Sequence, residues 1–330
     1  MMKWRTVIES ISFPFRITLD TKMLFLGSCF AENIGIKMAN HKFPIEINPT
    51  GISYNPISLA ENIRQAVNQK SVTSADIVQN GEQFVHFDFH SRLGHFDADI
   101  CLSQINRRLV QLHKAIHSSN LIFISLGSAV AFEHIKNQKI VSNCHKFPQE
   151  YFKKRQLKHV EISDSLNSII HDIHHLNPQA QFVFTISPVR HSRHGLIENN
   201  RSKANLISAV HDLVEQHKAL HYFPSYEIIV DDLRDYRFYN RDLVHPSEEA
   251  IEYIWSYFKD QYLDDQTKVD LESIKSLVNM YNHKALTTSP HKRIQFLNSL
   301  KDKMSHHPYQ DRFAEEITDI NNQITEMSTP

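Results

Sequence analysis

Three short, predominantly apolar runs constrain the fold of this chain most strongly. They are "MLFLG" at 23–27, "LIFISLG" at 121–127 and "QFVFTISPV" at 181–189. Runs this short and this apolar are typical of strands buried on both faces, as in a parallel sheet. A weaker candidate for a further strand is "KFPIEINP" at 42–49. The runs therefore predict a sheet in the interior of the protein.

Segments with helical spacing separate these runs. In "CLSQINRRLVQLHKAIH", apolar residues recur along one face of 102–116, and 160–175 and 202–217 show the same spacing. The segment 246–262 is also helical in pattern, with Pro246 at a favourable first helical position. Alternation of strands and helices indicates a doubly wound α/β sandwich.

The last fifth of the chain differs from the rest. Beyond the last of these segments, polar helical patterns carry narrower apolar stripes, such as the one from Ile294 to Met304. We therefore expect a core domain at 1–262 and a helical C-terminal extension at 263–330. This extension either packs on the core or supports a homodimer.

Composition excludes several classes of function. The net charge of −1 gives no overall field that would attract nucleic acid or an anionic membrane. Only 7 glycines occur, and no glycine-rich nucleotide-binding motif is present. No apolar run approaches the roughly 20 residues of a membrane span, and the first residues lack the pattern of a secretory signal. Three widely spaced cysteines do not indicate a disulfide scaffold. We expect a cytoplasmic protein without nucleic-acid or membrane partners.

The first apolar run ends in a glycine followed by Ser28. In open α/β sheets, ligands bind outside the carboxyl ends of the strands, which is where Ser28 falls. A hydroxyl there could act as a nucleophile beside the amide dipoles of the next helix. Alternatively, Ser28 only caps that helix. The adjacent Cys29 points about 100° away on the helix, and we expect it to be buried and inert.

A serine nucleophile needs a base, and "RDLVHPSEEA" at 241–250 offers one. Asp242 and His245 are one turn apart, just before the last core helix. This spacing lets the carboxylate accept from one ring nitrogen while the other faces the serine. The alternative interpretation is that Asp242 only caps the chain or forms a local salt bridge.

The segment "VHFDFHSRLGHFDAD" at 85–99 is rich in histidine and aspartate. Its spacing matches no zinc signature, so we predict no metal site there. The alternation of Val85, Phe87 and Phe89 with polar residues instead predicts extended chain with one buried face.

A second polar segment, "SPVRHSRHGLIENNRSKANL" at 187–206, follows a buried strand. Its donors could bind a sugar or a carboxylate, or they could belong to a solvated loop. The candidates for substrate or structural contacts are Arg190, Asn200, Ser202 and Lys203.

These features together resemble a known family. Ser28 combined with "DLVH" before the last core helix resembles the SGNH (GDSL-type) hydrolase superfamily. More narrowly, "GSCFAENIG" resembles the GSCFA-domain family, which is placed within that superfamily. The similarity extends over roughly 23–258 and includes "NPTGISYNP", "FDFH", "LGSAVAFE", "NCHKFP", "TISPVRHSRHG", "ENNRSKANL" and "FPSYEI".

The resemblance implies a three-layer α/β/α sandwich with a five-stranded parallel sheet, and chemistry on ester bonds. It implies that Ser28 is the nucleophile, His245 the general base and Asp242 its orienting partner. The backbone N–H groups of Ser28 and Gly51 would form two arms of the oxyanion hole.

The sequence departs from the superfamily pattern at the third arm of the oxyanion hole. Many members have an asparagine after a glycine in a "GxND" segment, whereas "LGSAV" places Ala129 at that position. Losing one such donor costs ~2.7–4 kcal/mol of transition-state stabilisation, so we expect a replacement. Asn143 is the first candidate and His145 the second. We also expect His90 and His145 to line the substrate cleft.

We therefore expect a serine-dependent acyl-ester hydrolase that works through an acyl-enzyme, without a metal or organic cofactor. Its substrate would be an O-acyl ester of a small molecule or a carbohydrate, such as an O-acetyl ester. One alternative is an acyltransferase of the same fold. Another is a non-catalytic carbohydrate- or ligand-binding protein that has lost a full oxyanion hole, which Ala129 motivates. A third is metal-dependent hydrolysis by the cluster at 86–97.

Overall fold

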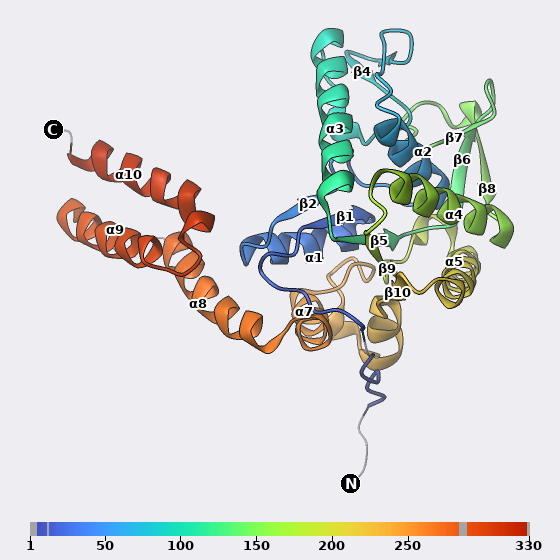
Figure 1. Ribbon diagram of the computed structural model, residues 1–330. Coiled ribbons are helices and arrows are strands. Elements are labelled where there is room, and N and C mark those ends of the chain that lie inside the picture. The colour runs from blue at the N-terminus through green and yellow to red at the C-terminus, as the bar shows by residue number, and fades with distance from the viewer. Residues whose placement is uncertain (1–4, 12, 284–288, 329–330) are drawn as a thin grey trace.

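A computed structural model describes residues 5–11, 13–283 and 289–328 of the chain. At its centre is a five-stranded sheet in the order β10-β9-β5-β1-β2, with all strands parallel (Figure 1). The predicted α/β architecture with five parallel strands is therefore confirmed. The strands are β1 (Met23–Gly27), β2 (Ile45–Ile47), β5 (Leu121–Leu126), β9 (Gln181–Ile186) and β10 (Leu220–Tyr222). All but β10 fall within the predicted apolar runs.

Alternate side chains of these strands enter two separate hydrophobic clusters. In β1, Leu24 and Leu26 belong to one cluster, and Met23 and Phe25 belong to the other. This alternation follows from the two-residue period of a strand. The first cluster includes side chains of α2 (Pro56–Val67), α3 (Ala98–Ser118), α4 (His159–Leu176) and α5 (Leu196–Gln216). The second includes α1 (Cys29–Asn40) and α7 (Glu248–Tyr262).

The start of α7 differs from the prediction. Ser247 is the N-cap, in extended conformation, and its hydroxyl accepts from the Ala250 N–H. Pro246 therefore lies outside the helix instead of at its first position. The reason is that Pro246 forms an isolated antiparallel bridge with Tyr239, which keeps the chain extended up to the cap.

Two small antiparallel sheets lie outside the main sheet, and the sequence did not predict them. A hairpin pairs β3 (Val78–Asn80) with β4 (Gln83–Val85). The other has β6 (Val130–His134) between β7 (Lys139–Val141) and β8 (Phe152–Gln156). The remaining short helices are η1 (Ser91–Leu93), η2 (Gln149–Tyr151), η3 (Ser192–His194), α6 (Ser225–Glu227), η4 (Ile228–Asp232), η5 (Tyr236–Phe238) and η6 (Gln310–Phe313).

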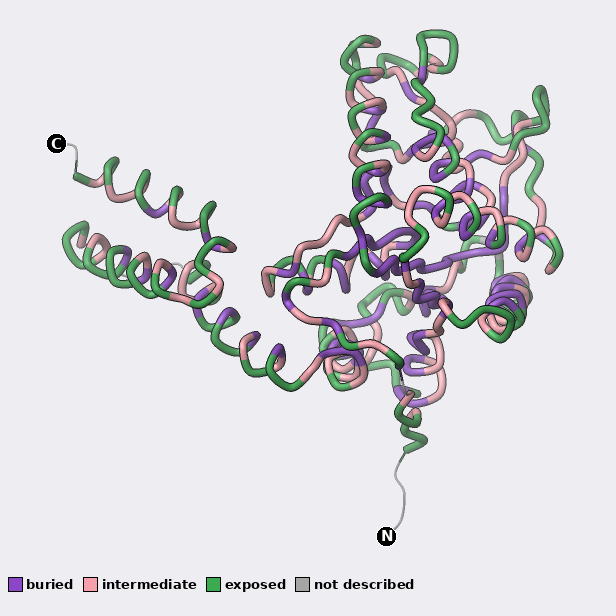
Figure 2. The backbone as a smooth tube through the Cα atoms, viewed as in Figure 1, coloured by how far each residue is buried: buried purple, intermediate pink, exposed green. Residues whose placement is uncertain are grey.

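The chain ends in three helices, α8 (Asp265–Asn282), α9 (Pro290–Ser305) and α10 (Ala314–Ser328). They form an arm that reaches away from the sheet (Figure 1). Buried positions continue along the inner faces of this arm (Figure 2). The arm is joined to the rest of the molecule by ion pairs of Lys42 with Glu316 and of Asp20 with Arg312. Whether the arm is a separate domain stays a prediction.

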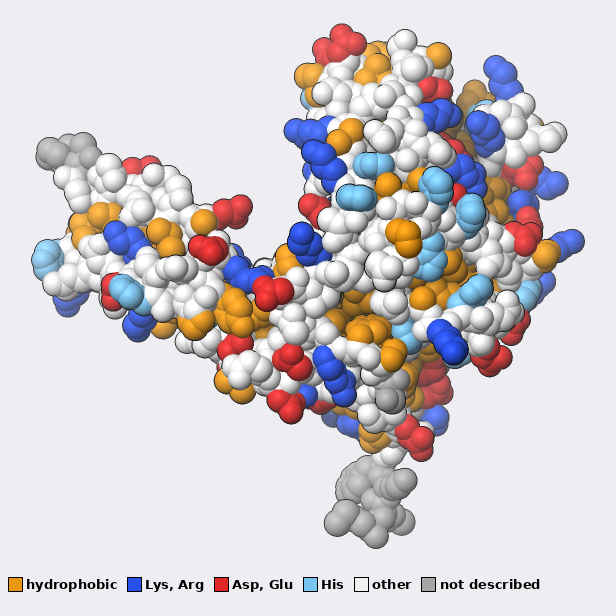
Figure 3. Space-filling view, viewed as in Figure 1, with side chains coloured by type: hydrophobic (Ala, Val, Ile, Leu, Met, Phe, Trp, Pro, Cys, Tyr) orange, Lys and Arg blue, Asp and Glu red, His pale blue; other side chains and the backbone are white. Residues whose placement is uncertain are grey.

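The surface in Figure 3 mixes acidic and basic side chains without a continuous field of one sign. Orange apolar patches interrupt this mixture on the visible face. Within 5–11, 13–283 and 289–328, no helix combines the length and apolar character needed to cross a bilayer.

Candidate active site

The junction of β1 and α1 holds Ser28 in a tightly packed corner. Gly27 closes β1 with φ +109°, and a Cβ added there would lie 2.1 Å from the Ser125 carbonyl oxygen. Only glycine tolerates both this dihedral angle and this approach. The chain then enters α1 with Ser28 as its N-cap. The prediction that Ser28 follows a buried strand and precedes a helix is confirmed.

The Ser28 side chain is almost completely buried, because the residue is only 1 % exposed. Its Oγ accepts from the Phe30 N–H at 3.2 Å and forms a hydrogen bond with the Ser125 Oγ at 2.7 Å. The first contact is the helix cap considered above as an alternative. The second ties the hydroxyl to the end of β5. A hydroxyl can accept and donate at the same time, so capping does not exclude nucleophilic chemistry.

Cys29 is partly exposed, whereas we expected it to be buried. It is the first residue of α1, at the carboxyl edge of the sheet. Partial burial nevertheless raises the pKa of its thiol. A thiol that stays protonated is a weak nucleophile, which agrees with the expected lack of reactivity.

Asp242 and His245 form a short hydrogen-bonded pair in the loop before α7. The Asp242 Oδ2 lies 2.6 Å from the His245 Nδ1. The other carboxylate oxygen accepts the N–H groups of Val244 and His245 at 2.9 and 3.0 Å. The His245 N–H, the imidazole and the Val244 N–H lower the pKa of Asp242 to about 2. The carboxylate is therefore ionised near neutral pH, and it fixes which ring nitrogen faces away from it.

The loop that carries this pair is attached to the carboxyl end of the sheet. Arg190, which follows β9, donates from Nη1 to the Tyr239 hydroxyl at 3.0 Å, and its guanidinium lies 5.9 Å from the centre of that ring. Lys37 of α1 also pairs with Glu248 at the start of α7, at 3.1 Å. The first contact ties the loop to the end of β9, and the second ties the start of α7 to the last turn of α1, which is the end of that helix away from Ser28.

The structure does not join Ser28 to His245 by a hydrogen bond. Among the described residues, the Ser28 hydroxyl contacts only Ser125 and Phe30, and the His245 ring contacts Asp242. The side chains of His245 and Asp242 are about half exposed. Catalytic hydrogen bonds are often long without substrate and tighten when substrate binds. The pair and the serine are thus separate units in this conformation.

Both backbone amides predicted for the oxyanion hole already have acceptors. The Ser28 N–H donates to the Ser125 carbonyl at 2.9 Å, which continues the pairing of β1 with β5. The Gly51 N–H donates to the Asn48 carbonyl at 2.8 Å and closes a turn in which Gly51 has φ +93°. An oxyanion could use these donors only by sharing or replacing those bonds.

The candidates for the third arm also make contacts within the fold. The Asn143 Oδ1 accepts the His145 N–H at 2.8 Å and stabilises a tight turn. The His145 ring is buried and contacts the His86 carbonyl through Nε2 at 2.9 Å. Burial lowers the pKa of His145 and favours its neutral form. Ala129, at the position of the usual asparagine, is fully buried.

His90 lies against the turn that carries Gly51. A Cβ added to Gly51 would be 2.2 Å from the His90 Cβ, so this contact also requires glycine. The His90 Nδ1 accepts the Arg92 N–H at 3.3 Å. Partial burial lowers the pKa of His90. His90 is therefore close to one predicted oxyanion donor, as the cleft-lining prediction requires.

The four candidates from 187–206 divide into two groups. Arg190 and Asn200 are accessible, the first half-buried against Tyr239 and the second exposed. Ser202 and Lys203 are each 1 % exposed and make structural contacts. Of the two roles considered for Ser202 and Lys203, burial supports the structural one.

Ser202 and Lys203 hold the ends of two central strands. The Ser202 Oγ accepts the Ala129 N–H at 2.6 Å, just beyond β5. The Lys203 Nζ donates to the carbonyl oxygens of Gly127 and Ser187 at 2.6 Å each. These two carbonyls follow β5 and β9, so one amine bridges the carboxyl ends of both strands.

The histidines of the segment 85–99 stabilise turns. In His86, His90 and His95, the Nδ1 atom accepts the backbone N–H two residues further along the chain, at 2.9 to 3.3 Å. Across the described ranges, no three His, Cys, Asp or Glu side chains come together as a group that could hold a metal ion.

The sequence interpretation missed two residues that complete this corner. Ser125 and Asn48 contact Ser28 and Gly27, respectively, through their side chains. Ser125 could have been found by the argument used for Ser28, since it is also a polar residue near the end of an apolar run. Asn48 could not, because its contact depends on how far β2 extends beside β1.

The parallel sheet and the serine at its first strand–helix junction define an α/β protein whose polar residues gather at the carboxyl edge of the sheet. Comparison with known families makes this class more specific. The family model of the GSCFA family matches residues 22–258, and the chain belongs to that family. No curated protein matches the chain.

Proposed function

We propose that this protein is a serine-dependent acyl-ester hydrolase of the SGNH type. In this proposal the sheet and its helices form the three-layer α/β/α sandwich of that superfamily. The substrate is an O-acyl ester of a small molecule or a carbohydrate. Ser28 carries the acyl group, His245 is the general base and Asp242 orients it.

One observation carries the proposal, namely the pair formed by Asp242 and His245. The 2.6 Å contact and the pKa of about 2 for Asp242 give an ionised carboxylate bound to one ring nitrogen. This arrangement leaves Nε2 of His245 as the basic atom. The match to the GSCFA family covers Ser28, and in this proposal Ser28 is the nucleophile that this base serves.

The reaction would proceed in two halves. Ser28 loses its contact with Ser125, attacks the ester carbonyl through Oγ, and gives its proton to the His245 Nε2. The alcohol leaves with that proton, and the acyl group stays on Ser28. Water then attacks the acyl-enzyme with His245 again as base, and the acid and free Ser28 are released. The first step requires the loop that holds His245 to approach α1.

A second function is favoured by the contacts of the two amides. Since the Ser28 and Gly51 N–H groups both donate to carbonyl oxygens, the site resembles one that holds a ligand without stabilising an oxyanion. A non-catalytic ligand-binding protein would have this arrangement. An acyltransferase would differ from the hydrolase only in the acceptor of the second half-reaction.

A fluorophosphonate probe distinguishes either serine enzyme from the ligand-binding protein, because it forms a covalent bond only with an activated nucleophile. We expect the wild-type protein to be labelled on Ser28 and Ser28→Ala to remain unlabelled. His245→Ala should reduce hydrolysis of an acetylated sugar by at least about 10³-fold, and Asp242→Asn by roughly 10⁴-fold through the wrong ring tautomer. Mass spectrometry of the labelled peptide and ester hydrolysis assays measure both effects.

The matched control is Asp97→Ala, which removes the N-cap of α3 and leaves Ser28 intact. This variant should lose about 1 kcal/mol of stability, as expected for a lost cap, and keep its labelling. Undiminished labelling of Ser28→Ala would exclude Ser28 as nucleophile. No labelling of the folded wild type, together with binding of the sugar ester, would support the ligand-binding function.

A further inference from the structure

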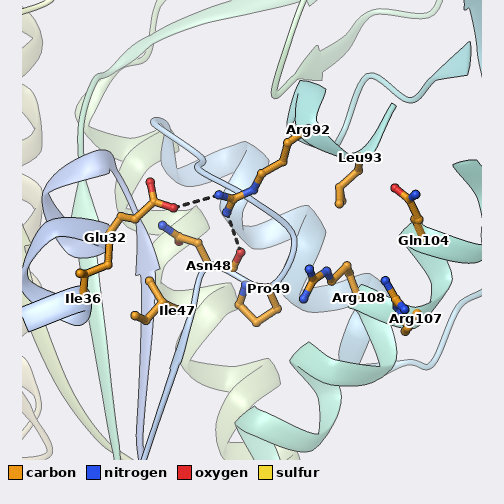
Figure 4. A pocket seen from close by; sticks show the side chains of 10 residues that line it. All are labelled: Glu32, Ile36, Ile47, Asn48, Pro49, Arg92, Leu93, Gln104, Arg107 and Arg108. Carbon is orange, nitrogen blue, oxygen red and sulfur yellow. Dashed lines mark hydrogen bonds and ion pairs between the residues drawn. The ribbon is translucent and has the colours of Figure 1, made fainter. Parts of the chain in front are cut away.

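A pocket of about 410 Å³ opens on the outer side of α1, next to the Ser28 corner. Its walls come from α1, the end of β2, η1 and α3 (Figure 4). Charged and apolar side chains both line it. They are Glu32, Ile36, Ile47, Asn48, Pro49, Arg92, Leu93, Gln104, Arg107 and Arg108.

The charge of this pocket is predominantly positive. Three arginines and one glutamate leave a net charge of +2 on the lining. Arg92 is already neutralised in part, because it pairs with Glu32 at 2.9 Å and donates to the Asn48 carbonyl at 3.2 Å. The two guanidinium groups on α3 are less compensated.

Arg107 and Arg108 lie across the pocket from Glu32 and Ile36 in Figure 4. Arg108 donates to the Gln111 Oε1 at 2.7 Å, which is a neutral acceptor. Arg107 is exposed, and its guanidinium group makes no hydrogen bond or ion pair with any residue that the structure describes. Two guanidinium groups without a carboxylate partner favour an anion at this wall.

Asn48 adds a buried donor at the base of the pocket. It is 2 % exposed, and its Oδ1 accepts the Gly27 N–H at 2.8 Å. This bond determines the orientation of the amide, because an NH₂ group could not accept from an N–H. The Nδ2 atom has no partner among the described residues. In Figure 4 this amide lies on the side of Glu32, so the anion-binding wall is formed by the arginines of α3 and not by Asn48.

Apolar side chains also line the pocket, with Ile36 and Ile47 across from the two arginines and Leu93 on the same side as them (Figure 4). Ile36, Ile47, Pro49 and Leu93 provide hydrocarbon surface beside the charged groups. Ile36 is 46 % exposed, so part of this surface faces solvent when the pocket holds no ligand. A ligand that fits both kinds of surface has a charged head and a short apolar body.

We propose that this pocket binds a small amphiphilic anion, with a carboxylate or phosphate head attached to a short apolar group. Arg107 and Arg108 hold the head (Figure 4). The apolar group covers Ile36, Ile47 and Leu93. This inference does not depend on ester chemistry at Ser28.

Calorimetric titration of the full chain with hexanoate and hexyl phosphate tests this site, with hexan-1-ol as the neutral probe. We expect at least one of the anions to bind with a Kd of roughly 1 mM or tighter, and hexan-1-ol to bind at least tenfold more weakly. The double variant Arg107→Gln, Arg108→Gln should raise the Kd of that anion at least tenfold. Whichever anion binds more tightly identifies the head group as carboxylate or phosphate.

The matched control is Lys114→Gln, which removes an exposed positive charge from the same helix outside the pocket. It should change the Kd less than twofold. An unchanged Kd in the folded double-arginine variant, or absence of binding by both anions, would overturn the proposal.

Discussion

At the scale of single residues, Lys203 places a primary amine in the interior between two strand ends. Burial lowers the pKa of Lys203 to about 7, and Arg190 contributes to this effect while Cys29 opposes it. A neutral amine still has two N–H groups. These match its two acceptors, the carbonyl oxygens of Gly127 and Ser187. The fold therefore tolerates the uncharged form of Lys203.

This titration predicts a pH dependence of stability. The folded pKa of Lys203 lies below the unfolded one, so between about pH 7 and 10 only the unfolded state keeps the proton. The buried, protonated amine of Lys203 destabilises the folded protein fully below pH 7. This destabilisation decreases as the pH rises and the folded state loses the proton. The wild type should therefore gain stability relative to Lys203→Met, by up to about 1.4 kcal/mol per pH unit.

Urea unfolding of both proteins at pH 6, 7, 8 and 9 measures this difference in the free energy of unfolding. Subtracting the two free energies of unfolding removes the contributions of groups that titrate in both proteins, such as the tyrosines and the cysteines other than Cys29. A difference that stays constant across this range would show that Lys203 remains charged in the folded protein.

At the scale of elements, the corner between β1 and α1 depends on Gly27. Gly27→Ala should destabilise the fold strongly, because its Cβ would lie 2.1 Å from the Ser125 carbonyl oxygen. Gly81→Ala is the matched control, since Gly81 also has positive φ (+62°) but nothing within 4 Å of the added Cβ. We expect Gly81→Ala to cost about 1–2 kcal/mol and Gly27→Ala clearly more.

Thermal and urea unfolding of the two variants provide the test. The prediction is contradicted if both variants lose the same free energy of unfolding. The positive φ angle alone would then account for the loss in Gly27→Ala, without the close contact with Ser125.

The elements also show what the sequence could reveal. The runs at 23–27, 121–127 and 181–189 were recognisable because strands buried on both faces are continuously apolar. The strands β6 and β8 were not recognised, since they are short and neither has the pattern of a strand: β6 is VAFEH, and β8, FKKRQ, has a single apolar residue. Length and composition cannot separate such strands from loops.

The candidate site was predictable to a similar extent. The contact of Asp242 with His245 is local, so spacing along the chain was sufficient to predict it. The acceptor of the Gly51 amide is local, since it is the Asn48 carbonyl three residues earlier. The acceptor of the Ser28 amide, the Ser125 carbonyl, lies on a distant segment, and only the tertiary structure reveals it. The same is true of the pocket, whose arginines come from two elements that the sequence places far from α1.

At the scale of the whole molecule, the arm of α8 to α10 shares its buried core with α1 and α7. Phe313 is fully buried, lies under the Lys42 ammonium and packs edge-on against His307. The ion pair between Lys42 and Glu316 lies beside it. Phe313 is therefore a main contact between the arm and the rest of the molecule. A homodimer formed through this arm stays a prediction.

Phe313→Ala should release the arm. Truncating a buried phenylalanine costs about 3–5 kcal/mol, whereas the control Phe296→Ala, at a residue that is 37 % exposed, should cost much less. Hydrogen exchange should accelerate in 289–328 of Phe313→Ala and remain slow in β1, β5 and β9. Equal acceleration in the sheet would show that the arm and the core unfold together.

The pairing of β1 with β5 also has a consequence for synthesis of the chain. Ser28 and Ser125, which meet at the ends of these strands, are 97 residues apart. At translation rates of about 5–20 residues per second, β1 waits roughly 5–20 s for its central neighbour to be made. During that interval "MLFLG" has only the three-residue β2 to pair with. Ribosome-bound chains of this length are therefore the state in which this protein most needs a chaperone.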